Sequence, residues 1–361
     1  MPLKFSISIP VLNAAHCLEA CLKSIRKQDY PNDLVEVLVA DGGSQDETCA
    51  IAKKYNARVL PNEKVLAEEG TKVAARHAAG DIFIVFAADN ELANKDWLST
   101  AAGMFEQDPK MAALWCKQIS GSADKPINRY YELIQNDPLS FFLNSNLGDY
   151  LREASITQAG RYRGYKFSVD SKRPLIWGAN GLAYRLDLVR HMLIGPEYIG
   201  DNDVFQTMAE EGNNQVAYVP ELNVIHHHVQ SVGQWVKKWK RNFGTHFLGH
   251  KDSRNMNWAM TSDFKTRLSL WFLYSGVPVF SGIDALAKMI RDKNIYWVYH
   301  PLMSFLQTTV YSCIMISRPE GRKMIGGLLR SNGGHSNNGG QPGAKKTKDL
   351  KLEACEQKRR V

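Results

Sequence analysis

The 361-residue sequence lacks the short motifs that mark several large protein classes. It contains no G-x-G-x-x-G after the first apolar segment and no G-x-x-x-x-G-K-[ST], so a dinucleotide fingerprint and a P-loop are both absent. None of its six cysteines forms a C-x-x-C pair, and their spacing matches no zinc module. We expect no signal peptide, because the first four residues lead directly into the strand-like segment Phe5–Ile9. We therefore expect unpaired thiols and a cytoplasmic location.

The body of the chain also carries little net charge. The whole sequence has 45 Lys and Arg against 37 Asp and Glu, a net charge of +8. Residues 317–361 hold 11 of the basic residues and 4 of the acidic ones, so this segment alone carries +7. A nearly neutral body argues against nucleic acid as a partner. The basic segment suits an anionic lipid surface, and its Gly, Asn and Lys content predicts a disordered tail over 331–361.

The first 120 residues alternate between apolar strands and amphipathic helices. This alternation predicts an α/β fold built on a doubly wound, mostly parallel sheet. Polar residues follow three of the strands, and in such sheets ligands bind at the carboxyl edge. The three residues are Asn13, Asp41 and Asp89. Strands are expected near 7–9, 34–40, 57–60 and 81–87, and helices over 14–27 and 69–79, with a capping box of Ser44 and Glu47 starting another helix between them.

The middle of the chain is less regular. Residues 120–175 are rich in Gly and Asn, and residues 161–166 interleave basic and aromatic side chains. This pattern is typical of a solvated loop, and the alternative is a lid that faces an acceptor. Regular structure returns with a helix after Gly200-Asp201-Asn202-Asp203, a strand over 216–219 and a basic, aromatic helix over 234–247.

Six segments, taken in order, resemble glycosyltransferase family 2. Ser8–Asn13 is similar to the P-x-x-N that ends the family's first strand, and Asp41–Thr48 is similar to its D-G-S-x-D-x-T. Asp89-Asn90, Gly178–Gly181, Gly200–Asp203 and His226 then follow at the expected spacing, so the resemblance covers about residues 3–245. It implies a GT-A fold, a nucleotide-diphosphate-sugar donor, Mg²⁺ or Mn²⁺, and inversion at the anomeric carbon.

The resemblance also implies a donor site. Asp41 would accept a nucleobase imide N–H, and Pro10 and Asn13 would line the same pocket; a UDP-sugar is the favoured donor. Lys72 and Arg76 lie one helical turn apart, which predicts either two phosphate contacts or a solvated basic face. Arg241, in the basic helix, is a further expected phosphate contact.

Asp89 is the expected metal ligand, with Glu91 and His226 as further ligands. The family usually supplies a second acid beside this aspartate, but Ala87 and Ala88 occupy those positions here. Two interpretations remain: a weak metal site that substrate phosphates complete, or a degenerate site. Neighbouring residues of a strand point to opposite faces, so at most two of His226, His227 and His228 can share a site. The last two are expected at the surface.

Asp201 is the expected catalytic base, and Asp203 is the second choice. Either carboxylate could deprotonate an acceptor hydroxyl, and either could simply cap the helix that follows. The small residues Gly178, Ala179, Asn180 and Gly181 would let an acceptor sugar approach closely. A glycan or a lipid-linked acceptor is expected, in glycan, polysaccharide or glycolipid assembly for the cell envelope.

The sequence predicts three regions: a glycosyltransferase domain over 1–250, a helical appendage over 251–330 and the tail. Residues 268–283 and 295–316 are apolar and uncharged, but a basic loop joins them. Because basic loops resist crossing a bilayer, we expect peripheral, in-plane contact with the cytoplasmic membrane face, and the alternatives are a soluble helical subdomain and a true span.

Two other functions remain open. The missing acid could mark a non-catalytic protein that binds a nucleotide sugar or glycan and acts as a scaffold. Nucleotidyl transfer is the weaker alternative, because it usually needs a Gly-rich basic loop after the first strand and residues 10–15 have neither feature.

Overall fold

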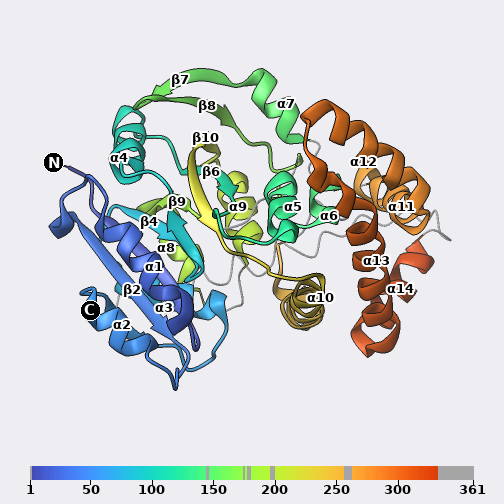
Figure 1. Ribbon diagram of the computed structural model, residues 1–361, viewed down its shortest axis with the longest axis horizontal. Helices are drawn as coiled ribbons and strands as arrows, with labels where there is room; N and C mark the ends of the chain where they lie inside the picture. Colours follow the sequence, from blue (N-terminus) through green and yellow to red (C-terminus); the bar gives the residue numbers. More distant parts are fainter. Residues whose placement is uncertain are drawn as a thin grey trace, which may run out of the picture. The chain divides into compact units, whose positions relative to one another are not determined.

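The computed structural model describes residues 2–143, 146–173, 175–176, 180–195, 200–255 and 262–331 (Figure 1). Contacts divide the chain into two compact units, Met1–Ile314 and Met315–Val361. The second unit contains the end of α13 and the helix α14 (Pro319–Ser331). The domain boundaries expected at 250 and 330 stay predictions.

One sheet organises the first unit. Its strand order is β3-β2-β1-β4-β9-β6-β10-β8-β7, and β5 pairs with β10 off this path. The strands are β1 (Phe5–Val11), β2 (Val35–Asp41), β3 (Arg58–Pro61), β4 (Ile82–Val85), β5 (Asn90–Leu92), β6 (Ala113–Ile119), β7 (Ser155–Ala159), β8 (Tyr162–Ser168), β9 (Leu182–Arg185) and β10 (Gln215–His226).

The sheet confirms the α/β prediction but is mixed. Strands β3, β2, β1 and β4 are parallel to one another, as the alternation of strands and helices predicted. Strand β9 is antiparallel to both β4 and β6, and β7, β8 and β5 add further antiparallel pairs. Apolar residues of β1, β2 and β4 are almost fully buried on both faces, because helices cover both sides of the parallel part.

Helices follow the strands of the parallel part. They are α1 (Ala15–Arg26), α2 (Thr48–Lys54), α3 (Ala67–His77) and α4 (Trp97–Gln107). The expected capping box is wrong. Helix α2 begins at Thr48, and the Ser44 hydroxyl contacts Oδ1 of Asp41 at 2.5 Å. Asp46 accepts the backbone N–H of Thr48 instead, so the start of the helix lies three residues later than the sequence suggested.

The middle of the chain is more regular than predicted. Residues 161–166 are part of the hairpin β7–β8, whose strands pair with each other and extend the sheet beyond β10. The expectation of a loop was wrong here because the hairpin has one exposed face, and its polar residues on that face hid the strand pattern. The helices of this region are α5 (Pro126–Ile134), α6 (Pro138–Leu143), α7 (Asn146–Glu153), α8 (Leu186–Leu193) and α9 (Asp201–Glu210).

The remaining helices follow β10. They are α10 (Val232–Arg241), η2 (Asn242–Phe247), η3 (Leu248–Ser253), α11 (Ser262–Gly276), α12 (Pro278–Asp292), η5 (Ile295–Tyr299) and α13 (His300–Ser317). Within the described segments, no single helix has the length and hydropathy of a membrane span. The pair Phe264–Gly276 and Pro278–Asp292 passes that test jointly, with an 89° bend at the break.

The topology places the candidate site. Strands β2, β1 and β4 are parallel neighbours, so their carboxyl ends lie at one edge of the sheet. Asp41 is the last residue of β2, Asn13 follows β1 and Asp89 follows β4. Strand β10 brings His226 to the same edge by pairing with β5, opposite Asn90.

Candidate active site

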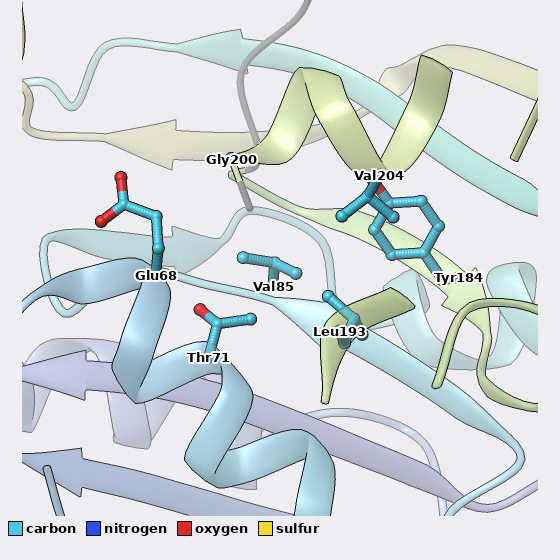
Figure 2. A pocket seen from close by; sticks show the side chains of 7 residues that line it. All are labelled: Glu68, Thr71, Val85, Tyr184, Leu193, Gly200 and Val204. Atoms are coloured by element: carbon cyan, nitrogen blue, oxygen red, sulfur yellow. The ribbon is translucent and has the colours of Figure 1, made fainter. Parts of the chain in front are cut away.

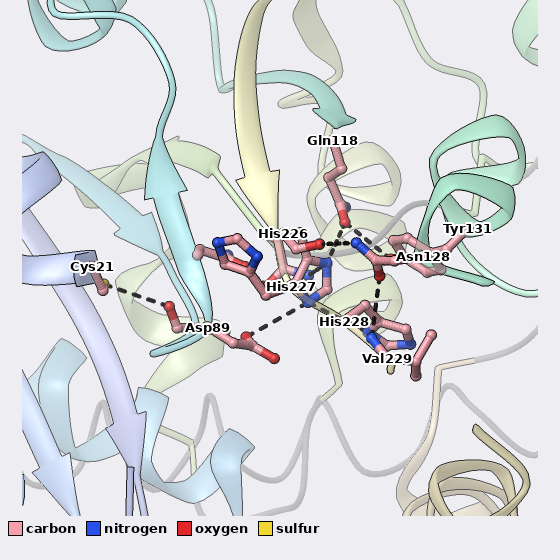
Figure 3. Close-up of polar contacts among 12 residues, drawn as sticks. Cys21, Asp89, Gln118, Asn128, Tyr131, His226, His227, His228 and Val229 are labelled. Carbon is pink, nitrogen blue, oxygen red and sulfur yellow. Dashed lines mark hydrogen bonds and ion pairs between the residues drawn. The ribbon is translucent and has the colours of Figure 1, made fainter. Parts of the chain in front are cut away.

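Asp89 lies in the short turn between β4 and β5, at the carboxyl edge of the sheet (Figure 3). Its Oδ1 atom is 3.6 Å from Nε2 of His226, and its Oδ2 atom is 4.0 Å from Nζ of Lys238 on α10. A carboxylate from one strand end therefore faces an imidazole from β10 and an ammonium group from a helix.

His226 is held in a defined orientation. Its ring is 4% exposed, and its Nδ1 atom lies 2.7 Å from the side-chain oxygen of Gln118. The same oxygen accepts the hydroxyl hydrogen of Tyr131, which fixes it as an acceptor. Nδ1 of His226 therefore donates to Gln118, and Nε2 is the ring nitrogen that faces Asp89.

His228 lies against His226, on the side of the cluster that faces Tyr131. Its ring stacks on Tyr131 with centroids 4.2 Å apart, and its Nδ1 atom lies 3.4 Å from Nε2 of His226. Lys238 donates a hydrogen bond to the backbone oxygen of His228. Burial, with the charges of His226 and Lys238, holds the pKa of His228 well below its usual range. His228 is therefore neutral near pH 7.

The charges around Asp89 keep it ionised. Burial alone would raise the pKa of this carboxyl group. The positive charges of His226 and Lys238 outweigh that effect and lower its pKa far below the ordinary value. Burial lowers the pKa of Lys238 in turn, and Asp89 partly restores it. Asp89 is thus a charged, largely enclosed carboxylate, which is the form that binds cations.

The donor set fits a divalent cation only in part. No group of three or more His, Cys, Asp or Glu side chains that could hold a metal occurs in the part of the chain that the structure describes. Asp89 and His226 nevertheless place a carboxylate oxygen and a ring nitrogen 3.6 Å apart. Mg²⁺ is commonly bound through one or two carboxylates, and substrate phosphates and water complete its shell. Asp89 fits that role once phosphate oxygens are present, and His226 places a ring nitrogen beside it.

Glu91, the third expected metal ligand, contacts a different residue. Its Oε1 atom lies 3.1 Å from Nε2 of His227, whose Nδ1 atom is 2.7 Å from Asp124. Burial lowers the pKa of His227, but the hydrogen bonds with the two carboxylates outweigh it, so the net pKa is raised.

The expectation that His227 and His228 lie at the surface was wrong. Both rings are half-buried, because His228 stacks on Tyr131 of α5 and His227 lies between Glu91 of β5 and Asp124. The expectation that only two of the three histidines share a site is confirmed. His226 and His228 contact each other, and His227 points to the opposite face.

At the end of β2, Asp41 folds onto its own loop. Its carboxylate accepts the backbone N–H groups of Gly43 and Ser44 at 3.1 Å, as a turn aspartate would. Asn13 adopts a left-handed conformation with φ of 51°, and its side-chain oxygen accepts the N–H of Gln45 at 2.9 Å. The loops that follow β1 and β2 are thereby joined. Pro10 is paired with Ala40 just before them.

The three predicted phosphate contacts differ in exposure. Lys72 is 1% exposed, and its ammonium group donates to the Gly195 carbonyl oxygen at 3.1 Å and pairs with Glu69 at 3.3 Å. Arg76 donates to the Ile194 carbonyl oxygen. Arg241 is exposed at the end of α10. The phosphate roles of all three stay predictions.

Two of the four predicted acceptor residues lie among the described residues. Asn180 reaches the histidine cluster, because its Oδ1 atom accepts from Asn90 at 2.9 Å and its Nδ2 atom is 3.2 Å from Nδ1 of His226. Gly181 has φ of +75°, and a Cβ atom there would lie 2.6 Å from a methyl group of Val224. Gly178 and Ala179 lie outside the described residues.

Asp203, the second choice of catalytic base, is tied into the start of α9. Its Oδ2 atom accepts the backbone N–H of Gly200 at 2.8 Å and forms an ion pair with Arg254. Burial raises the pKa of Asp203, and Arg254 offsets this only in part. These contacts are those of a helix-capping residue rather than of a solvent-facing base. Asp201 is the first residue of α9, and its side chain lies outside the described residues.

The start of α9 lies close to the end of β4. Gly200 and Val204 line a small pocket together with Val85, the last residue of β4 (Figure 2). Thr71 of α3 lines the same pocket. This pocket is mostly apolar and holds about one water molecule, so it is too small for a nucleotide sugar. It does place the backbone of Gly200-Asp201 near the strand end that leads to Asp89.

Sequence reasoning chose Arg241 over Lys238 in the basic helix, and it missed Gln118 and Asn128. Lys238 could have been found, since it lies three residues after the buried Trp235 on one face of α10, whereas Arg241 lies beyond it. Gln118 is a single polar residue at the end of a buried strand and gives no pattern. Asn128 donates to the His226 carbonyl oxygen from α5, and nothing in the sequence connects it to β10.

Residues 6–173 match the family model described as glycosyl transferase family 2. A poly(ribitol-phosphate) beta-N-acetylglucosaminyltransferase, TarS, from Staphylococcus aureus is 32% identical over 111 residues, which is 29% of this chain and 19% of that protein. A dolichyl N-acetyl-alpha-D-glucosaminyl phosphate 3-beta-D-2,3-diacetamido-2,3-dideoxy-beta-D-glucuronosyltransferase from Methanococcus voltae is 29% identical over 120 residues, 30% of this chain and 37% of that protein. The chain thus spans only about a fifth to two fifths of these relatives.

The fold has a solved counterpart. The mannosyltransferase PcManGT from Pyrobaculum calidifontis, in complex with GDP-Man and Mn²⁺, superposes with a TM-score of 0.51 over 86% of each chain at 15% identity. At that level of identity the likeness concerns the fold.

Proposed function

Because this chain carries a glycosyl transferase family 2 domain of the GT-A fold, we propose that it moves a sugar from a nucleotide-diphosphate donor to an acceptor hydroxyl, with inversion at the anomeric carbon. The observation that carries the proposal is the cluster at the carboxyl edge of the sheet. There the ionised Asp89 faces His226 and Lys238, and the Asp41 loop closes the neighbouring strand end.

Asp89 and His226 would hold a divalent cation, Mg²⁺ or Mn²⁺, together with phosphate oxygens of the donor. When bound, such a cation neutralises charge on the departing diphosphate. Lys238 adds a fixed positive charge beside the same carboxylate and would contact the diphosphate directly. The Mn²⁺ in PcManGT supports this part of the proposal.

Asp201 is the proposed base, an assignment that rests on the family resemblance and on the place of α9. The carboxylate would take the proton of the acceptor hydroxyl while the hydroxyl oxygen forms a bond to the anomeric carbon. The bond from that carbon to the diphosphate oxygen breaks in the same displacement, and the nucleoside diphosphate leaves with its charge.

The donor and acceptor are proposed only by class. A UDP-sugar is favoured, and a glycan or a lipid-linked molecule is the proposed acceptor, in cell-envelope assembly at the cytoplasmic side of a membrane. PcManGT binds GDP-Man, so the donor screen must include both nucleobases.

The proposal is tested by incubating the full chain with UDP- and GDP-sugars in the presence of Mn²⁺ and measuring nucleoside diphosphate release. Binding of the same donors is followed by thermal shift. Asp201→Asn should lower turnover at least about 100-fold and leave donor binding unchanged. Equal loss of binding and turnover would give Asp201 a structural role.

The same assay separates the scaffold alternative. Ala87 and Ala88 leave Asp89 without a neighbouring acid, and a degenerate site would bind donor without ever releasing nucleoside diphosphate. Donor binding without hydrolysis or transfer for any donor and acceptor tried would favour that function over catalysis.

A further inference from the structure

Helix α12 exposes its large apolar residues and buries small ones, whereas an ordinary amphipathic helix of a globular protein buries its large apolar residues. Its large apolar residues form one stripe at positions i, i+4, i+7 and i+11, and each is at least half exposed. These are Val279 (64%), Ile283 (64%), Leu286 (52%) and Ile290 (69%). The opposite face buries the small residues Ser281 and Ala285 against the neighbouring helices.

The corner between α11 and α12 continues this stripe. Residues 276–280, Gly-Val-Pro-Val-Phe, are all exposed and contain no group with a charge. The last turns of α11 add Leu270, Phe272 and Leu273, each slightly more than half exposed. We name this surface the apolar corner, and define it as Leu270, Phe272, Leu273, Val277, Val279, Phe280, Ile283, Leu286 and Ile290.

The exposure of the apolar corner does not come from poor packing of α11 and α12, since other side chains of these helices are buried. Trp271 and Ser275 of α11 are buried, and Tyr274 donates its hydroxyl hydrogen to Asp284 of α12 at 2.5 Å. His300 of α13 lies 2.7 Å from the same hydroxyl and 2.6 Å from that of Tyr130 on α5. The helices are therefore anchored by a buried polar network, and their apolar residues face outward.

The charges around the apolar corner identify its partner. Residues 264–314 contain five Lys and Arg against two Asp. Asp284 pairs with Lys288, and Asp292 pairs with Arg291. Both acids within residues 264–314 are therefore paired with a basic residue. The chain that continues after α13 adds the net charge of +7 between residues 317 and 361. An apolar surface on a chain with a net basic helical segment and a net basic C-terminal segment fits a bilayer that carries anionic headgroups.

We propose that the apolar corner inserts shallowly into an anionic lipid bilayer, with α11 and α12 lying in the interface. The 89° bend between the helices supports this mode, because it lets the corner enter the acyl layer while both helices stay at headgroup depth. The inference does not depend on the catalytic proposal. Helix α5 connects the helical region to the candidate active site, since Tyr130 contacts His300 of α13 and Tyr131 stacks on His228.

The test is flotation of the full chain with vesicles of phosphatidylcholine and phosphatidylglycerol in a 7:3 ratio, and with vesicles of phosphatidylcholine alone. The double variant Phe280→Glu/Ile283→Glu should lower the bound fraction at least about tenfold. It replaces two apolar side chains, whose transfer from water into the bilayer favours binding, with two charged ones. Ile156→Glu is the matched control, since Ile156 is equally exposed, at 68%, on the distant hairpin β7–β8. The control should float like the wild type, and both variants should keep the wild-type unfolding temperature and donor binding.

Three results would overturn the proposal. They are no flotation of the wild type with either vesicle, equal loss in the Ile156→Glu control, and a wild-type dimer in solution that the double variant dissociates while vesicles bind neither protein. The last result would assign the apolar corner to a second copy of this chain. Nucleoside diphosphate release measured without vesicles tests the catalytic proposal separately.

Discussion

The Nε2 atom of His226 lies 3.6 Å from Oδ1 of Asp89, although one residue ends β10 and the other follows β4. The pairing of β5 with β10 produces this approach, because it sets His226 opposite Asn90. Gln118 then holds Nδ1 of His226, so the other ring nitrogen faces the carboxylate. The sheet edge thus brings the two proposed cation ligands together beside Lys238.

Lys238 should contribute to donor binding through its charge. Lys238→Gln removes the ammonium group that lies 4.0 Å from Asp89, and we expect the dissociation constant for the nucleoside diphosphate to rise about tenfold or more. Calorimetric titration measures it. Lys237→Gln is the matched control, since Lys237 is exposed on the next position of the same helix and should bind like the wild type. If both variants bound the nucleoside diphosphate equally weakly, the loss would reflect the change in net charge and not a contact made by Lys238.

Substitution of Asp203 should affect mainly the stability of the protein, whereas substitution of Asp201 should affect mainly turnover. Asp203→Asn breaks a buried ion pair with Arg254, and we expect it to lower the free energy of unfolding by about 3–5 kcal/mol. Asp201→Asn should leave that free energy close to the wild-type value. Urea unfolding of both variants, followed by tryptophan fluorescence, makes the comparison. A stable Asp203→Asn protein without turnover would instead make Asp203 the base.

The contribution of His227 to stability should depend on pH. Asp124 and Glu91 raise the pKa of His227 in the folded protein, so its stabilising effect is complete below the unfolded value of about 6.5 and is lost as pH rises through the higher folded pKa. His227→Gln should therefore lower the free energy of unfolding by about 1–3 kcal/mol at pH 6 and by less at pH 9. A larger loss at pH 9 than at pH 6 would contradict the assigned ion pairs.

The sequence predicted the parallel part of the fold well, because strands buried on both faces read as continuous apolar segments. Residues 34–40 and 81–87 are of that kind, and both lie in the central sheet. The hairpin β7–β8 was missed because one of its faces is exposed and polar. The start of α2 was misplaced because Ser44 bonds to Asp41, a contact between side chains that helix signals do not encode.

For the site, topology was enough to bring Asp41, Asn13 and Asp89 to one edge. It was not enough to find the residues that orient them. Gln118 reaches His226 only because β6 and β10 are neighbours, and that pairing joins segments a hundred residues apart in the chain. Lys238 enters from a helix whose face toward the site was not distinguished from its exposed basic face.

The most direct measurement is the binding of UDP and of GDP to the wild type and to Asp89→Asn, titrated with and without Mn²⁺. The account predicts that Mn²⁺ tightens the binding of one of them to the wild type and that Asp89→Asn abolishes this dependence while unfolding at the same temperature. Mn²⁺-dependent binding of the same strength in Asp89→Asn would contradict it, because the carboxylate at the end of β4 would then have no part in holding the donor.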